Sequence, residues 1–150
     1  EMNRMGVENA RSVIVDAQKT LPIDVKADLV ILDPPCTSTG AFGRTPSAKW
    51  RLTKQSVFNM AKVQWNMLNS CAEKVKTGGH LVYSTCSISL EENEILLERF
   101  LKWNLNFSFV DAAPRIGLPG FRGQDLCQRL YPQIHDCNGF FVAKMMKKDH

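Results

Sequence analysis

Short apolar runs spaced along the chain predict the strands of a sheet. Residues 29–32, Leu-Val-Ile-Leu, form a continuous apolar run, which is typical of a strand buried on both faces. Two prolines follow, and because proline cannot donate a backbone hydrogen bond to a sheet, this strand must end at Asp33. Other β-branched or apolar runs predict strands at residues 12–17, 80–86, 106–110 and 140–145.

Helical periodicity between these runs predicts two long helices. Apolar residues recur at helical spacing from Thr53, a suitable N-cap, to about Lys76, and the Thr-Gly-Gly that follows is expected to end this helix. Ser-Leu-Glu-Glu at residues 89–92 has the pattern of a capping box, so a second helix is predicted from there to about Trp103. Residues 111–137 are rich in glycine and proline and predict a long loop. Strands that alternate with helices indicate an α/β domain with a mainly parallel sheet.

The composition is that of an ordinary globular protein. Its 150 residues suffice for one domain with a core, and 44% of them are hydrophobic and 23% charged. No apolar run approaches the ~20 residues that cross a membrane, and no signal peptide is visible at the N-terminus, so no membrane partner is expected. The net charge of +4 favours a polyanionic partner.

The five cysteines indicate a reduced, intracellular setting. Their number is odd and none forms a Cys-x-x-Cys pair, which argues against a disulfide framework and a structural zinc site. His80 and His135 also lack the carboxylate or cysteine spacing of metal ligands, so no metal is expected. Cys71 is expected to be a small buried apolar residue, which leaves one or two other thiols free for chemistry.

Two of the predicted strands end in side chains that can react or polarise a substrate. The first delivers Asp33 and Cys36, and the second delivers Cys86. If the two strands are neighbours, their ends lie ~5 Å apart, close enough for one substrate atom to touch both. A thiolate is a strong nucleophile once its pKa is lowered, and the helix expected after Cys86 could contribute to this. The alternative without chemistry is a buried strand followed by a proline-terminated loop, and the chemistry alone does not choose between the two thiols.

Several motifs resemble the Nop/Sun (RsmB-like) family of RNA cytosine-5 methyltransferases. Residues 33–40, Asp-Pro-Pro-Cys-Thr-Ser-Thr-Gly, look like the family's Asp-(Ala/Pro)-Pro-Cys-(Ser/Thr)-Gly-(Ser/Thr)-Gly motif, and residues 83–87 resemble its Tyr-Ser-Thr-Cys-Ser motif. Further matches are Glu-Glu-Asn-Glu at 91–94, the Arg-x-Pro-x-x-Lys-Trp loop at 44–50, a helical glutamine at 64 and Asn-Gly-Phe-Phe-Val-Ala-Lys at 138–144. The resemblance covers essentially the whole chain.

The resemblance implies a Rossmann-like class I methyltransferase fold with S-adenosylmethionine as cofactor. Cys86 would attack C6 of a cytosine so that C5 can accept the methyl group, and Cys36 would assist resolution of the covalent adduct. Asp33 would contact the base edge and the cofactor, and Asp16 would contact the cofactor adenine. DNA cytosine-5 methyltransferases use the cysteine of the Pro-Cys motif as nucleophile, here Cys36, but the match around Thr85-Cys86 favours Cys86.

An RNA partner, either rRNA or tRNA, follows from the same resemblance. The target base must be unstacked, and Arg44, Lys49 and Arg51 would hold phosphates near it while Trp50 offers a stacking face. The alternative is a solvated basic loop with Trp50 packed inward. A monomer is expected, in the cytoplasm or, in a eukaryote, in the nucleolus.

Residues 1–150 are expected to form a single, truncated methyltransferase domain. The sequence lacks two parts of the family's domain: the first strand with its glycine-rich cofactor loop, and a second strand with an acid that contacts the ribose. The fragment is therefore expected to be inactive alone. The glycine-rich residues 117–123 do not replace that loop, because they neither follow a clear strand nor open a helix. Two other functions stay open: a non-catalytic RNA-binding or scaffold module, and an amino-group methyltransferase of the Asp-Pro-Pro-Tyr type, against which the thiol of Cys36 argues.

Overall fold

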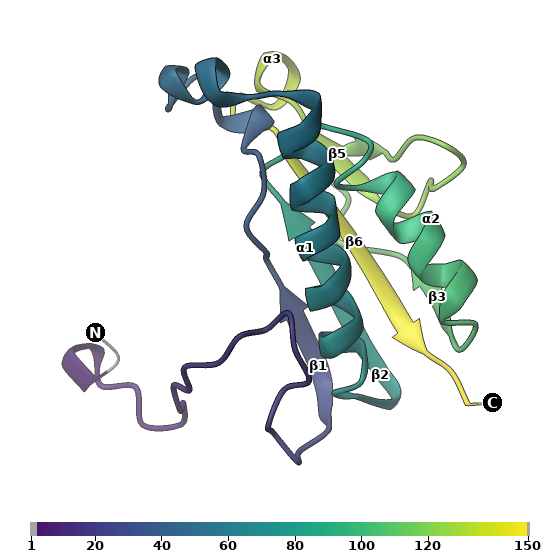
Figure 1. Ribbon diagram of the computed structural model, residues 1–150. Helices are drawn as coiled ribbons and strands as arrows, with labels where there is room; N and C mark the ends of the chain where they lie inside the picture. Colours follow the sequence, from purple (N-terminus) through teal and green to yellow (C-terminus); the bar gives the residue numbers. More distant parts are fainter. Residues whose placement is uncertain (1–2, 150) are drawn as a thin grey trace.

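The computed structural model describes residues 3–149 and contains one six-stranded sheet. The strands are β1 (Ala27–Leu32), β2 (Val75–Thr85), β3 (Phe107–Val110), β4 (Leu118–Pro119), β5 (Gln128–Leu130) and β6 (Phe140–Lys147). Their order is β1-β2-β6-β5-β4, with β3 also paired to β6 (Figure 1). The α/β Rossmann-like expectation is confirmed. The sheet is mixed rather than mainly parallel as expected, since β1 and β2 are parallel and the other pairs are antiparallel. The antiparallel pairs all involve the C-terminal strands β3 to β6, between which the chain has no long helix that would return it in the parallel direction.

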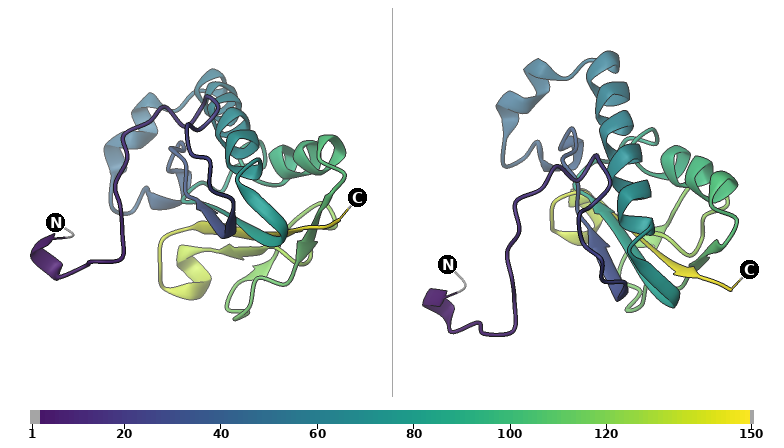
Figure 2. Two further views of the ribbon diagram at one scale, coloured as in Figure 1. Left: turned by 90° about the horizontal axis from the view of Figure 1, so that it is seen from below. Right: turned by 60° about the horizontal axis from the view of Figure 1, so that its bottom comes forward.

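The helices α1 (Lys54–Ala72) and α2 (Glu94–Trp103) cover the same face of this sheet (Figures 1 and 2). Shorter helical segments are η1 (Asn3–Met5), η2 (Thr39–Ala41), η3 (Pro46–Arg51) and α3 (Pro132–His135). Fully buried side chains of both helices and of the central strands form the core, among them Leu68, Leu81, Leu97, Phe100, Phe141 and Met145. None of the helices in residues 3–149 is long and apolar enough to span a membrane.

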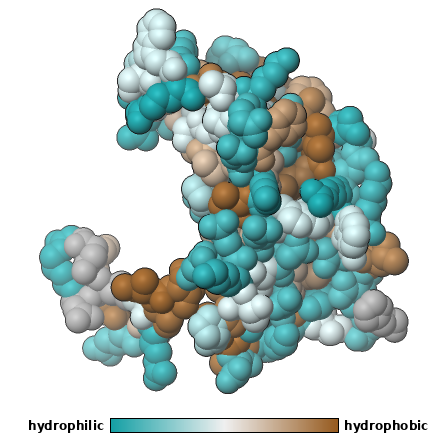
Figure 3. All heavy atoms as spheres, in the orientation of Figure 1, coloured by the Kyte–Doolittle hydropathy of each residue, from teal (hydrophilic) through white to brown (hydrophobic). Residues whose placement is uncertain are grey.

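The predicted strand at residues 12–17 is wrong. These residues have no strand conformation, and Val13 and Ile14 are 63% and 101% exposed. They belong to an extended arm that leads away from the sheet, and Figure 3 shows apolar side chains on it next to a hollow below the η3 segment. β-Branched residues favour a strand only where a neighbouring strand accepts their hydrogen bonds, and the described residues offer none here.

The expectation that β1 is buried on both faces is also wrong. Val30 and Leu32 pack against the core, whereas Leu29 and Ile31 on the other face are 52% and 66% exposed. In the described chain β1 is an edge strand and α1 covers only one of its faces. The strand nevertheless ends at Leu32, directly before Asp33, as the prolines require.

Two helix boundaries and one expected loop differ from the predictions. Thr53 caps α1 as predicted, through its side chain and Ser56, but α1 ends at Ala72. The Thr-Gly-Gly segment at 77–79 lies inside β2, where the register against β1 shifts and Gly78 adopts a positive φ of 77°. Residues 89–92 form no capping box, and α2 begins at Glu94. The stretch 111–137 contains β4, β5 and α3 rather than one long loop.

Candidate active site

Two neighbouring strand ends bring the predicted thiols together. β1 and β2 run parallel with Leu32 opposite Tyr83, so their chains leave the sheet at the same edge. The Sγ atoms of Cys36 and Cys86 lie 3.0 Å apart, within hydrogen-bond distance. Both side chains are partly exposed. We call Cys36 and Cys86 the thiol pair, and its formation from residues 50 positions apart is the central feature of the site.

The backbone around Gly40 fixes the position of Cys86. The N–H of Gly40 donates to the carbonyl of Cys86 at 2.9 Å, and the N–H of Gly139 donates to the carbonyl of Gly40 at 2.8 Å. These two glycines pack backbone against backbone, since a Cβ on Gly40 would lie 2.7 Å from the Cα of Gly139. Only glycine allows so close an approach. The loop after β1, the end of β2 and the start of β6 are therefore locked together at the thiol pair.

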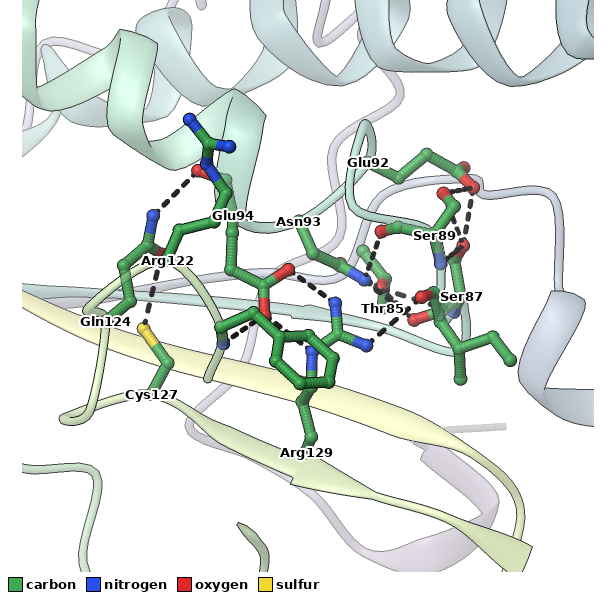
Figure 4. Close-up of polar contacts among 12 residues, drawn as sticks. Thr85, Ser87, Ser89, Glu92, Asn93, Glu94, Arg122, Gln124, Cys127 and Arg129 are labelled. Carbon is green, nitrogen blue, oxygen red and sulfur yellow. Dashed lines mark hydrogen bonds and ion pairs between the residues drawn. The ribbon is translucent and has the colours of Figure 1, made fainter. Parts of the chain in front are cut away.

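Glu92 is the polar centre of the site and is fully buried. Its Oε1 accepts from the backbone N–H of Thr37 and from Nε2 of Gln64, both at 2.9 Å. Its Oε2 accepts from the hydroxyl of Thr37, from Ser87 Oγ at 2.5 Å and from Ser89 Oγ at 2.9 Å. Figure 4 shows the two serines converging on this carboxylate. A buried carboxylate without a cation is stabilised by such donors, and this one joins the loop that carries Cys36 to the loop that follows Cys86.

Gln64 connects α1 to the same centre. Its Nε2 also donates to the carbonyl of Pro35 at 3.0 Å, so the amide bridges two acceptors, while its own Oε1 has no partner among the described residues. Leaving a buried acceptor unpaired costs about 1–3 kcal/mol. With the side chain in this orientation, both N–H groups of Gln64 donate to the two loops of the site, one to Pro35 in the loop after β1 and one to Glu92 in the segment after β2.

Asn93 and Tyr83 hold the segment after β2 from the other side. Asn93 accepts from Thr85 Oγ1 at 2.7 Å and donates to the carbonyls of Ser87 and Ser89 at 2.8 and 2.9 Å (Figure 4). The hydroxyl of Tyr83 donates to the carbonyl of Glu92 at 2.7 Å. Burial, with the nearby carboxylates, raises the pKa of Tyr83 well above its ordinary value, so its hydroxyl stays a donor.

The surroundings of Cys36 keep its thiol protonated. Burial, together with the hydrogen bond to Cys86, raises the pKa of Cys36 to about 12. Cys36 is therefore protonated at neutral pH and can donate to the sulfur of Cys86 at 3.0 Å. This assigns the role of donor within the pair to Cys36.

A buried ion pair supports the loop beyond Cys86. The guanidinium of Arg129 and the carboxylate of Glu94 are almost fully buried, and Arg129 makes two hydrogen bonds to that carboxylate (Figure 4). Arg129 also donates to the carbonyl of Ile88 at 3.1 Å and lies over the rings of Phe121 and Phe141. A pair so fully hydrogen-bonded belongs to the scaffold of the site.

The predicted RNA-binding residues lie on the exposed segment 44–51. Trp50 is 89% exposed, so the interpretation that packs it inward is wrong. Arg44 and Lys49 are exposed, with Lys49 5.5 Å from the ring of Phe42. Arg51 lines a cavity of about 340 Å³, whose other walls are Cys36, Thr37, Ala48, Leu52, Ser56 and Met60. Cys36 and Arg51 thus line the same cavity.

The two predicted carboxylates lie in different surroundings. Asp33 follows β1 directly, is exposed and has no hydrogen-bond partner among the described residues. Asp16 lies in the extended arm, where its carboxylate accepts from the backbone N–H of Gln18 at 3.1 Å and lies 3.6 Å from Lys19. The described contacts do not bring Asp16 to the thiol pair.

Sequence reasoning missed the role of Glu92 and of Ser38. The run that contains Glu92 was interpreted as a helix start, although four acidic or amide residues in sequence before an apolar helix could also have indicated buried acceptors. Ser38 stands where the resembled motif has glycine, but this departure could not show its role, which depends on a positive φ and on two sulfurs that meet only in the fold.

Comparisons with known proteins agree with this geometry. A family model described as "16S rRNA methyltransferase RsmB/F" matches residues 1–146. The chain is 34% identical to the 25S rRNA (cytosine-C(5))-methyltransferase nop2 of Schizosaccharomyces pombe and 35% identical to a tRNA (cytosine(72)-C(5))-methyltransferase of Pyrococcus horikoshii. Each match covers 97% of this chain but only 26% and 36% of the relative, so the chain spans about a quarter to a third of their length.

Solved structures show the same similarity. NSun6 from Pyrococcus horikoshii, solved with SFG, superposes with a TM-score of 0.88 at 34% identity and covers 99% of this chain and 37% of its own. A methyltransferase homolog protein from the same organism superposes with a TM-score of 0.82 at 28% identity, covering 99% and 48%. TrmN from Thermus thermophilus, at 13% identity and a TM-score of 0.56, shares the fold alone.

Proposed function

The chain belongs to the 16S rRNA methyltransferase RsmB/F family, and on this premise we propose that it carries the catalytic centre of an S-adenosylmethionine-dependent RNA cytosine-5 methyltransferase. The observation that carries the proposal is the thiol pair, with sulfurs 3.0 Å apart at two neighbouring strand ends. The relatives named above are cytosine-C5 methyltransferases of rRNA and tRNA, so the proposed substrate is a cytosine in one of these RNAs.

S-adenosylmethionine is the proposed cofactor. SFG, with which the NSun6 neighbour was solved, is an analogue of it. The fit of this chain to such a cofactor rests on Asp33, a carboxylate without a partner at the carboxyl end of β1, where ligands bind in open α/β sheets. We assign Asp33 to the cofactor and the base edge, and Asp16 to the adenine. The cofactor supplies the methyl group when bound.

The mechanism assigns different steps to the two thiols. The sulfur of Cys86 bonds to C6 of the cytosine and the electron pair of the C5–C6 double bond becomes available at C5, which takes the methyl group. A water molecule then takes the C5 proton, the electron pair of that C–H bond reforms the C5–C6 double bond, and the bond between C6 and sulfur breaks with its electron pair on sulfur. Cys36 is protonated and 3.0 Å away, so it can donate a hydrogen bond to the departing sulfur, which then takes its proton from solvent.

The cavity between Cys36 and Arg51 is the proposed entrance for the base. Its volume of about 340 Å³ is sufficient for an unstacked pyrimidine, which must leave the stack before C6 is accessible. Arg44, Lys49 and Arg51 would neutralise phosphates, and the exposed ring of Trp50 would stack on a neighbouring base. The proposed location is the cytoplasm, or the nucleolus in a eukaryote.

Trapping of the covalent adduct tests the proposal. The full-length protein that carries this sequence is incubated with S-adenosylmethionine and RNA containing 5-fluorocytosine, in which C5 bears no proton to lose. We expect a denaturation-resistant protein–RNA adduct that is absent in Cys86→Ala and present in Cys36→Ala. Cys137→Ala is the matched control, because Cys137 is exposed and far from the thiol pair in sequence.

The possible results separate the candidate functions. An adduct that persists in Cys86→Ala and disappears in Cys36→Ala would transfer the nucleophile to Cys36. Methylated RNA without any adduct would favour an amino-group methyltransferase, and RNA binding without methylation would favour a scaffold module. The structure gives neither rival specific support, since a thiol stands where the Asp-Pro-Pro-Tyr type has an aromatic ring.

A further inference from the structure

Ser38 adopts a backbone conformation that favours glycine. Its φ and ψ are 54° and 31°, in the left-handed region, where a residue with a Cβ is disfavoured. It precedes η2 as the N-cap residue, yet its side chain makes no capping hydrogen bond. The hydroxyl therefore does not offset the energetic cost of the left-handed conformation by capping the short helix.

The hydroxyl of Ser38 faces the thiol pair instead. Ser38 Oγ lies 3.3 Å from the Sγ of Cys86 and 3.9 Å from the Sγ of Cys36. Within residues 3–149 these two sulfurs are its hydrogen-bond partners. The same left-handed turn that disfavours a side chain thus directs the hydroxyl of Ser38 to the sulfur that we assign as nucleophile, whereas the hydroxyls of Thr37 and Thr39 bond to Glu92 and Ser87.

We propose that Ser38 is a further catalytic residue, whose hydroxyl donates a hydrogen bond to the Cys86 thiolate and stabilises it for attack; this rests on the function proposed above. When Cys86 is a thiol, its S–H donates to Ser38 Oγ. When the proton of Cys86 leaves to solvent, the hydroxyl rotates and donates to the sulfur, which keeps the electron pair that later bonds to C6. Cys36 is the other group in contact with that sulfur, so the thiolate has two donors.

The stabilisation predicts a measurable change in thiolate reactivity. A hydrogen bond to a charged group is stronger than one to a neutral group and is lost when the hydroxyl is removed. The rate of alkylation by iodoacetamide follows the thiolate fraction. We therefore expect removal of the hydroxyl to lower the alkylation rate of Cys86 at neutral pH by about tenfold and to move the midpoint of its pH profile upward.

Two substitutions separate this chemistry from backbone strain. Ser38→Gly removes the hydroxyl and relieves the left-handed conformation, whereas Ser38→Ala removes the hydroxyl and keeps it. Alkylation of Cys86 in the full-length protein is followed by mass spectrometry of its peptide. We expect both variants to lose about the same factor of ten, with Ser38→Gly at least as stable as the parent protein. Ser47→Ala, at an exposed serine in η3, is the matched control and should leave the rate unchanged.

Each alternative outcome overturns the proposal. If Ser38→Gly alkylates like the parent protein while Ser38→Ala is impaired, Ser38 has only a structural role. If both alkylate like the parent protein, the hydroxyl does not stabilise the thiolate. Alkylation requires neither RNA nor cofactor, so absence of the 5-fluorocytosine adduct in the parent protein would reject the proposed function while leaving the effect of Ser38 on Cys86 measurable.

Discussion

Replacing Glu92 by glutamine tests whether one buried charge holds the two catalytic loops together. The amide oxygen of Glu92→Gln can still accept from the two N–H donors, Thr37 and Gln64, and its NH₂ can donate to the hydroxyls, which rotate. A hydrogen bond to a charged acceptor contributes about 1 kcal/mol more than one to a neutral acceptor. The two N–H donors alone therefore predict a loss of about 2 kcal/mol of unfolding free energy.

Removing the acceptor entirely should cost more. Glu92→Ala leaves the buried donors unpaired and opens a cavity, which predicts a loss of about 4 kcal/mol. Urea unfolding of the full-length protein, followed by a probe within this domain, measures both changes as shifts of the midpoint at constant slope. Glu91→Gln, at a half-buried neighbour with no ion pair among the described residues, should stay within about 0.5 kcal/mol. Equal midpoints for Glu92→Gln and Glu91→Gln would refute the reasoning, because the charge would then contribute nothing.

Three further predictions concern the loop, the aromatic surface and the thiol pair. Gly40→Ala places a Cβ 2.7 Å from backbone of the facing glycine and should cost about 2 kcal/mol in urea unfolding, whereas Gly43→Ala, with no atom within 4 Å of the new Cβ, should not. Trp50→Ala should weaken binding of single-stranded RNA about fivefold or more in a fluorescence titration, and Trp103→Ala, at a 74% exposed position on α2, should not. Oxidised glutathione, which accepts two electrons, should convert the thiol pair into a disulfide that blocks alkylation of both sulfurs until dithiothreitol is added. The exposed Cys137 should instead carry a glutathione adduct in the mass spectrum.

The strand ends could be predicted from the sequence because their determinants are local. Two prolines end β1 whatever surrounds it, and Thr53 caps α1 through residues in its own turn. The pairing of Cys36 with Cys86 also followed, since parallel neighbours joined by a helix bring their carboxyl ends to one edge.

What the sequence did not predict depends on partners distant in the chain. The run 12–17 has the composition of a strand, but pairing decides whether one forms, and the described chain supplies no partner. Residues 89–92 have the pattern of a capping box, but Glu92 turns to Thr37 and Gln64, which lie 55 and 28 positions away. Composition likewise could not show that the glycine-rich stretch contains β5, because this strand forms by pairing with β6 beyond the stretch.

The contacts around the thiol pair explain how reactive sulfurs can be held in place while they stay accessible. Gly40 is hydrogen-bonded to Cys86 on one side and to Gly139 on the other, so backbone hydrogen bonds tie the loop after β1 to the end of β2 and to the start of β6. Glu92 connects the same loops through its carboxylate, which accepts hydrogen bonds from Thr37 and Ser87. Because backbone and carboxylate fix the loops, the thiols need not be fully buried to be held in place, and both remain partly exposed. A nucleophile positioned by strand register rather than by burial keeps a face free for the base that it must attack.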